Sequence, residues 1–229
     1  LKKLVYASYD EDGAHGIRYE YDSKGRLVKA YWGSQYSDVY VYNGNTVTGT
    51  SFTEDWNNVL SGKLNANGFI ETMTSQDKNV GHIRVENFIY DKDGHMIKCT
   101  SSMNSDGGYG YYSEDIFVWV NGDIVSGANK YDYKESEYDE ETNYSFKYTN
   151  DVVTEPIENK ACILFAHPYL EVLSDYISLR NLYGVAGKHL PVSAIDNKGN
   201  ENKFEWTFDA DGYPIKVVDK YSTLYLTWE

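Results

Sequence analysis

Apolar and polar residues alternate along most of this chain with a period of two. In the segment 204–208, Phe and Trp residues alternate with Glu and Thr, whereas the segment 116–120 is apolar at every position. A period of two places successive side chains on opposite faces of a strand. The pattern therefore predicts an antiparallel β protein in which some strands have one wet face and others are apolar on both faces.

A short phrase recurs between these segments: an aromatic residue, Asp or Asn, two further residues and Gly. Its best copies are 21–25, 90–94 and 208–212, and its polar and glycine positions recur at 10–13, 65–68 and 196–199. The phrase is typical of a type I turn closed by the Asp side chain and followed by a left-handed Gly bulge. We therefore expect a positive φ at Gly25, Gly94 and Gly212.

A second set of turns has two residues. Asn43-Gly44, Asn121-Gly122 and Asn150-Asp151 stand between alternating segments, as hairpins with primed turns require. Together the two sets predict a long meander of hairpins.

One stretch, 154–191, interrupts the meander. Within it, residues 169–179 carry apolar side chains at three- and four-residue spacing, and Gly184 and Gly187 follow as stop signals. We predict one helix there, with Leu170, Leu173 and Ile177 turned toward the sheet. The expected organisation is a single all-β domain over 1–229: a meander (1–153), a helix-containing insertion (154–191) and terminal hairpins (192–229).

The connections of the meander differ in length at its two ends. The tight turns near residues 25, 44, 68, 94, 122 and 150 would all lie at one end of the sheet. The connections 33–35, 53–58, 75–81, 102–110 and 127–141 would lie at the other end, and most are longer. Because long loops on a rigid scaffold often carry function, we predict the binding face at the long-loop end.

Aromatic and acidic residues gather in these longer connections and beside them. The candidate ligand-binding residues are Tyr109, Tyr111, Tyr112, Tyr131, Tyr133, Tyr138 and Trp56. Rings among carboxylates could hold a sugar, a peptide or a cation. A competing interpretation is that the tyrosines pack edge strands and the acids keep those edges from pairing.

The Tyr-Asp-x-x-Gly-x-apolar phrase, seen in 21–27 and 90–96, resembles the short repeat of YD-repeat proteins. Together with the interruption and the segment 182–191 (LYGVAGKHLP), the chain is similar to uncharacterised secreted and lipoprotein families of gut Bacteroidetes with a porin-like antiparallel β fold. The resemblance implies an exported location, secreted or lipid-anchored at the cell surface or in the periplasm, and an open or closed barrel-like sheet. It carries no catalytic residue.

Net charge and mean hydropathy limit the classes of molecule that this chain could bind. The 229 residues include 21 Lys and Arg against 35 Asp and Glu, a net charge of −14, which repels nucleic acid and anionic lipid. The mean hydropathy is −0.59, and the strands lack a continuous apolar outward band, so we expect a protein that does not span a membrane. The start at Leu1 suggests a processed chain. Cys99 and Cys162 allow at most one disulfide, and nothing in the sequence fixes the oligomeric state.

No catalytic, cofactor or metal motif is recognisable. Asp-x-Asp-Gly occurs at residues 10, 91 and 209 and overlaps half a calcium loop, but without the later glutamate, so we interpret it as turn chemistry. The five histidines show no metal-ligand spacing. We expect no cofactor and no metal, and predict a non-enzymatic binding or structural protein for a glycan or cell-surface polymer. The alternative is a polysaccharide hydrolase whose carboxylate pair is assembled in space.

Overall fold

The computed structural model describes residues 2–11, 16–32, 36–52, 57–104, 110–133, 140–164 and 182–229. Nearly all regular structure in these ranges is β. The strands are β1 (Leu4–Ser8), β2 (Gly16–Tyr21), β3 (Leu27–Trp32), β4 (Tyr36–Asn43), β5 (Thr46–Phe52), β6 (Asn57–Leu64), β7 (Ile70–Asp77), β8 (Ile83–Tyr90), β9 (Met96–Asn104), β10 (Tyr111–Val120), β11 (Asp123–Tyr133), β12 (Glu140–Lys147), β13 (Ile157–Glu158), β14 (His189–Leu190), β15 (Ser193–Asp196), β16 (Glu201–Lys203), β17 (Glu205–Phe208), β18 (Pro214–Val218) and β19 (Thr223–Trp228). The predicted helix at 169–179 lies outside the described residues.

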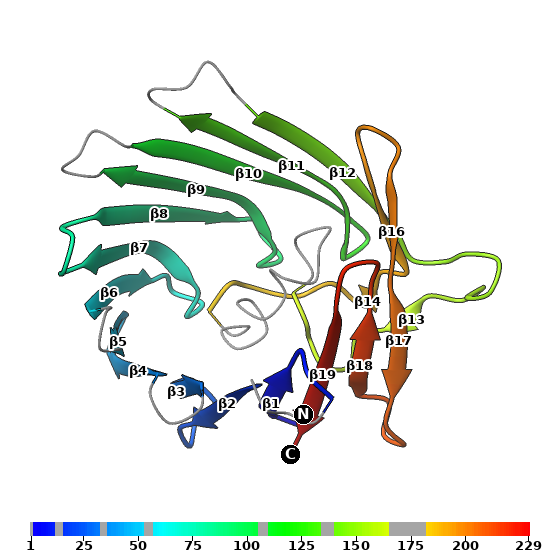
Figure 1. Ribbon diagram of the computed structural model, residues 1–229, viewed down its shortest axis with the longest axis horizontal. Helices are drawn as coiled ribbons and strands as arrows, with labels where there is room; N and C mark the ends of the chain where they lie inside the picture. The colour runs from blue at the N-terminus through cyan, green and yellow to red at the C-terminus, as the bar shows by residue number, and fades with distance from the viewer. Residues whose placement is uncertain are drawn as a thin grey trace.

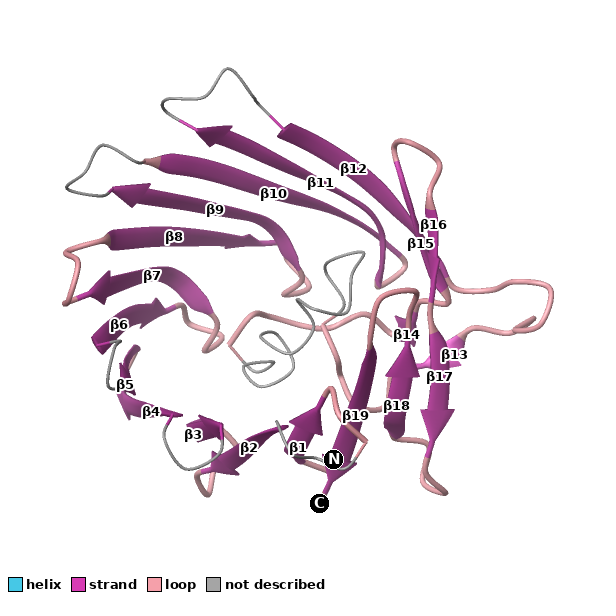
Figure 2. Ribbon diagram, viewed as in Figure 1, coloured by secondary structure: helices cyan, strands magenta, loops and turns pink. Residues whose placement is uncertain are grey.

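Antiparallel pairing runs almost completely around a 17-stranded sheet (Figures 1 and 2). Each strand from β1 to β12 pairs with the next, β12 pairs with β15 and β15 with β16. β17 continues the run of β16 and pairs with β18, β18 pairs with β19, and β19 returns to β1. The prediction of an all-β, barrel-like meander is confirmed. β13 and β14 form a separate two-stranded sheet.

The turn phrase has the predicted conformation. Gly25, Gly94 and Gly212 have φ values of +77°, +88° and +83°. At the first copy, Asp22 Oδ1 accepts the backbone N–H groups of Lys24 and Arg26, both at 2.9 Å. The strand register shifts just before each of these turns. The Asp side chain and the left-handed Gly thus act together to reverse the chain and preserve the strand twist.

The two-residue turns are only partly as predicted. Asn121 and Gly122 both have positive φ, +55° and +89°, as a type I′ turn requires. At the second site Asn43 pairs with Thr46, so the central residues are Gly44 and Asn45, one position later than predicted. Of these two central residues, Gly44 has the positive φ, +57°.

The prediction of a hairpin at Asn150-Asp151 is wrong. The Asn150 side chain does close a turn, because its Oδ1 accepts the N–H groups of Val152 and Val153. The chain after it does not return along β12, which pairs with β15 instead. Pro156 stands where a returning strand would need a backbone N–H donor, and proline has none.

The interruption crosses the tight-turn end of the sheet. We call residues 182–190 the strap. Its backbone bonds to three successive tight turns: Leu182 O accepts Ile70 N–H at 2.8 Å, Val185 N–H donates to Gly94 O at 2.8 Å, and Lys188 N–H donates to Gly122 O at 3.0 Å. Figure 1 shows this segment running past the inner ends of β7, β9 and β11. The strap therefore ties separate hairpins together.

Apolar side chains from all parts of the sheet and from the strap form one core. Its most deeply buried members include Leu4, Val47, Ile70, Met96, Ile124, Ile163, Leu164, Leu190, Val217 and Leu224. Burial of this kind supplies the main favourable free energy of folding. On β8 to β11 the buried residues Phe88, Met96, Phe117 and Ile124 lie toward the tight-turn end, which leaves the other end of these four strands for polar groups.

The glycines of the turn phrase should not be equally sensitive to alanine. We expect Gly25→Ala to cost about 1–2 kcal/mol, because only its left-handed backbone is strained. Gly94→Ala should cost about 1–3 kcal/mol more, since a Cβ would lie 3.0 Å from both Phe69 Cε2 and Val185 Cγ2. Urea denaturation measures both losses. Equal losses would show that the strap moves aside freely.

Candidate functional site

Polar side chains line the inside of the sheet on four neighbouring strands, β8 to β11. On β8, Arg84 and Glu86 alternate with outward residues and share a face with the buried Phe88. On β10, Ser113 and Asp115 share a face with the buried Phe117. We call the inward polar set the inner wall; it comprises Arg84, Glu86, Ser101, Tyr111, Ser113, Asp115, Asn129 and Tyr131.

Strand register arranges the inner wall in three rows. The row nearest the long-loop end runs Arg84, Met103, Tyr111. The second row runs Glu86, Ser101, Ser113, Tyr131, and the third runs Phe88, Cys99, Asp115, Asn129. Directly opposed residues on neighbouring strands have their Cβ atoms about 4.5–5.5 Å apart, so each row brings its side chains into contact range.

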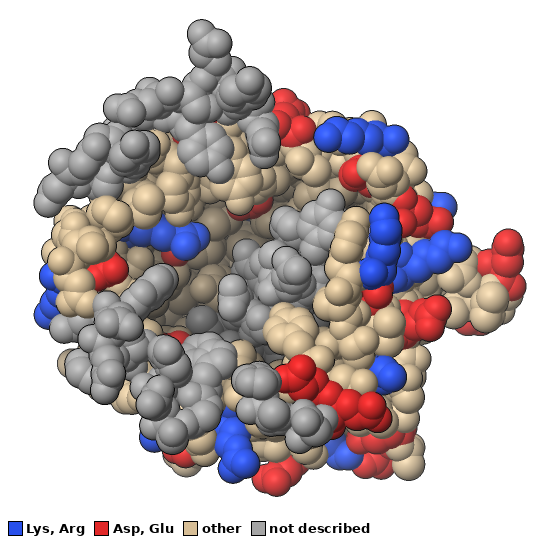
Figure 3. Space-filling model, viewed as in Figure 1, with Lys and Arg blue, Asp and Glu red and all other residues tan. Residues whose placement is uncertain are grey.

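Arg84 is fixed in position but remains accessible. Its Nη2 lies 2.6 Å from Glu86 Oε1, and its Nε donates to Ser101 Oγ at 2.9 Å. The Arg84 side chain is nevertheless 47% exposed, against 10% for Glu86. Figure 3 shows a hollow on the viewed face, with basic side chains on its wall where Figure 1 places β7 and β8. Because the Arg84 side chain is half-exposed on the inner face of the sheet, its guanidinium can offer its remaining N–H donors to a bound molecule.

Two carboxyl groups of the inner wall hold protons more tightly than usual. Burial raises the pKa of Glu86, and the ion pair with Arg84 only partly opposes it. Burial also raises the pKa of Asp115, against the hydrogen bond that Asn129 Nδ2 donates to its Oδ1. Cys99 lies beside Asp115 in the third row, and burial raises the pKa of its thiol, which makes it a poor nucleophile. Both cysteines are free, Cys99 buried and Cys162 exposed.

The predicted ligand-binding residues separate into three groups. Tyr111 and Tyr131 lie on the inner wall, in the first and second rows. Tyr112 lies on the outward face of β10, where its hydroxyl donates to Glu114 Oε2 at 3.1 Å. Three of the remaining candidates lie outside the described residues: Tyr109, Tyr138 and Trp56. The backbone of Tyr133 is described, but its side chain is not.

The prediction did not include the charged members of the inner wall. Arg84 and Glu86 carry a usable signal, because both stand at the same strand parity as the large aromatic residue Phe88. A charge in the register of core aromatics marks a polar group facing inward. The strand pattern alone does not show which strands are neighbours in the sheet, and therefore which of these side chains lie together.

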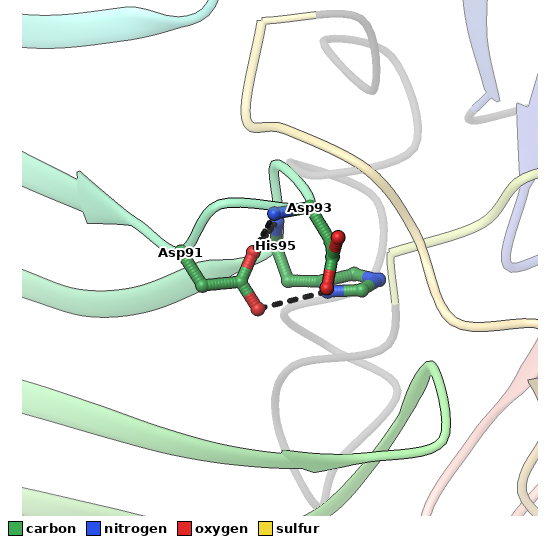
Figure 4. A group of neighbouring side chains, drawn as sticks. All are labelled: Asp91, Asp93 and His95. Atoms are coloured by element: carbon green, nitrogen blue, oxygen red, sulfur yellow. Dashed lines mark hydrogen bonds and ion pairs between the residues drawn. The ribbon is translucent and has the colours of Figure 1, made fainter.

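A group of possible metal ligands occurs at the turn between β8 and β9 (Figure 4). Ligand atoms of Asp91, Asp93 and His95 lie within 4.8 Å of one another. Asp91 Oδ1 accepts the backbone N–H groups of Asp93 and His95, its Oδ2 lies 3.0 Å from His95 Nδ1, and the His95 ring stacks on Trp119. These contacts are those of the turn phrase and fix His95 against the core, so they support turn chemistry as the role of this Asp-x-Asp-Gly copy.

Comparison with known proteins gives a family and a fold. A family model described as "Domain of unknown function (DUF4595) with porin-like fold" matches residues 9–216. No curated protein matches the chain. In the part of the chain that the structure describes, no helix combines the length and the apolar character needed to cross a membrane.

Two solved structures are similar over the whole chain. A porin-like protein from Bacteroides uniformis has 19% identity and a TM-score of 0.68, with 99% of this chain and 98% of that chain covered. A porin-like protein from Bacteroides vulgatus has 12% identity and a TM-score of 0.71, with 100% and 99% covered. At these identities the likeness concerns the fold alone. It agrees with the resemblance to Bacteroidetes families inferred from the turn phrases.

Proposed function

We propose that this chain, which belongs to the family of domains of unknown function with porin-like fold (DUF4595), is an exported, non-enzymatic binding protein for a glycan or cell-surface polymer. The observation that carries the proposal is Arg84, a half-exposed guanidinium held by Glu86 and Ser101 on the inside of the sheet. The strap crosses the tight-turn end, so the ligand would enter from the long-loop end.

The chemistry of the inner wall suits a saccharide. Sugar hydroxyls both donate and accept hydrogen bonds, and the wall offers guanidinium donors, carboxyl acceptors and serine hydroxyls within three adjacent rows. The aromatic rings of Tyr111 and Tyr131 stand in the same rows. The Arg84–Glu86 pair has no net charge when both groups are ionised, which favours a neutral ligand over a strongly anionic one.

Ion pairs on the outward face of the sheet support a protein whose outer surface is in contact with water. Lys98 on β9 lies 2.6 Å from Glu114 on β10, and Lys63 on β6 lies 2.8 Å from Glu71 on β7. Charged groups on an outward face are costly in a lipid environment. The Bacteroides origin of the similar solved structures supports an extracytoplasmic location, secreted or lipid-anchored.

Affinity electrophoresis in gels containing laminarin, dextran, xylan or pullulan tests the proposal. We expect the wild type to be retarded by at least one of them, and Arg84→Gln to weaken that binding roughly 10- to 100-fold, because a hydrogen bond from a charged donor contributes about 1.5–3 kcal/mol. The double variant Tyr111→Ala/Tyr131→Ala should lose retention while its melting temperature stays nearly unchanged.

Lys98→Gln, on the outward face of β9, is the matched control and should bind as the wild type does. Retention of the wild type by none of the four polysaccharides would contradict the proposal. So would undiminished binding by Arg84→Gln. A large loss of stability in the double tyrosine variant would show that these rings belong to the core.

The second candidate function is hydrolysis of such a polymer. The observation in its favour is that Glu86 and Asp115, on one wall, both have raised pKa values, as a general acid requires near neutral pH. New reducing ends released from a bound polysaccharide by the wild type, and not by Asp115→Asn, would support hydrolysis over simple binding.

A further inference from the structure

We infer that a second saccharide-binding surface lies at the rim of the sheet, in the pocket lined by Tyr9 and residues 219–223. We call it the rim pocket. The inference rests on the proposed function, because it assigns to the rim pocket another sugar unit of the same polymer. None of the predicted candidates belongs to this pocket.

Strand pairing places the rim pocket at the long-loop end. Ser8 at the end of β1 pairs with Tyr225 near the start of β19, so Tyr9 comes next to the turn that joins β18 to β19. Successive turns of an antiparallel sheet alternate between its ends. The turn 219–222 therefore lies at the same end as the first row of the inner wall, where Arg84 stands.

The pocket has a suitable size and lining. Its volume is about 500 Å³, and it is lined by Tyr9, Asp219, Lys220, Tyr221, Ser222 and Thr223. Small-molecule sites commonly have volumes of about 300–1,000 Å³. Two tyrosine rings with hydroxyl, carboxylate and ammonium groups around them provide the apolar and polar contacts that a pyranose ring needs.

Both tyrosines are exposed, and the backbone that carries Tyr221 is well fixed. Tyr221 is 60% exposed and Tyr9 is 39% exposed. Lys220 Nζ lies 5.1 Å from the centroid of the Tyr221 ring. An aromatic ring has much apolar surface to bury, so rings held in water beside a pocket indicate a contact surface.

The backbone of the turn 219–222 is held in place by Asp219 and the buried Asn202. Asp219 Oδ1 accepts the backbone N–H groups of Tyr221 at 2.8 Å and Ser222 at 2.7 Å. Asp219 Oδ2 accepts Asn202 Nδ2 at 3.0 Å, and Asn202 Oδ1 accepts the Lys220 N–H at 3.2 Å. The turn is thus anchored to β16, and little ordering entropy remains to be lost when a ligand binds.

The rim pocket lies at the same end of the sheet as the entry that we propose for the inner wall, so one long polymer could contact both. A short oligosaccharide fits the inner wall alone, whereas a long chain gains a second contact at the rim pocket. Two contacts on one polymer chain raise its overall affinity, because the second contact forms at a high effective concentration once the first has formed. The rim pocket should therefore matter for the polymer and not for its short fragments.

The test compares a polymer with its own fragment. The polymer is whichever polysaccharide of the panel retards the wild type. We expect Tyr9→Ala/Tyr221→Ala to weaken binding of this polymer by about tenfold or more. Calorimetric binding of the corresponding hexasaccharide should be unchanged. Tyr112→Ala is the matched control, because Tyr112 is also an exposed tyrosine, 41% exposed, on the outward face of β10.

The outcomes separate this inference from the proposed function. Unchanged affinity of the double variant for the polymer would overturn the rim pocket and leave the inner wall intact. Parallel loss of polymer and hexasaccharide binding would support the rim pocket and move the primary site away from the inner wall. Absence of wild-type binding to every polysaccharide would overturn both. If the double variant does not fold, the same comparison of polymer and hexasaccharide binding is made with Tyr221→Ala alone, since the Tyr221 ring is the more exposed of the two.

Discussion

Replacing Gly184 by alanine is expected to destabilise the protein by about 2–5 kcal/mol, the sum of left-handed strain and overpacking. Gly184 has φ +96°. A Cβ there would lie 2.5 Å from Gly94 O and 2.8 Å from Tyr90 Cε1. Neither neighbour can yield easily, because Gly94 O accepts Val185 N–H and the Tyr90 hydroxyl donates to Ile70 O. Urea denaturation, read by its midpoint and slope, measures the loss.

Gly199→Ala is the control for this prediction. Gly199 also has a left-handed backbone, φ +82°, but a Cβ there would meet nothing within 4 Å. It should cost only about 1–2 kcal/mol from backbone strain. The excess at Gly184 then measures how firmly the strap sits on the tight turns. Equal losses at the two glycines would show that the strap contributes little to stability.

The sequence allowed the hairpins to be predicted because their signals are local. Asp22 and Gly25 fix one turn within five residues, and Asp91 and Gly94 repeat it. Where the local signal was weaker, the prediction was less good: Asn150 closes a turn without a hairpin. The strap could not be predicted, because Gly184 and Gly94 are far apart in the chain and no periodic pattern connects them.

The candidate site was predictable only in part for a similar reason. Tyr111 and Tyr131 were found from composition near the long connections. Arg84 and Glu86 were visible as charges on one strand, but their role depends on which face turns inward. In the segment 116–120 both faces are apolar, and the structure buries Phe117 while Ile116 and Val118 stay exposed. A strand of this kind does not reveal its inner face until its neighbours are known.

The second large effect is expected at Asn159, which clamps the strap from the side opposite the tight turns. Its Nδ2 donates to Ile163 O and Gly187 O, both at 2.8 Å, and its Oδ1 accepts Ile163 N–H at 3.0 Å. Its own backbone N–H donates to Lys188 O at 2.7 Å. We expect Asn159→Ala to cost roughly 3–5 kcal/mol, because three backbone groups lose partners in a buried setting.

Asn143→Ala is the matched control for Asn159→Ala. The Asn143 side chain is exposed and donates to the exposed carboxylate of Glu141, at 3.1 Å, so its loss should change the free energy of unfolding by no more than about 0.5 kcal/mol. Hydrogen exchange gives a second readout that a general loss of packing would not produce. In Asn159→Ala the amides of Val185 and Lys188, which bond to the turns at Gly94 and Gly122, should exchange faster than those of β10 and β11. If all these amides accelerated together, the strap would open only with global unfolding, and the clamp would not be a separate unit.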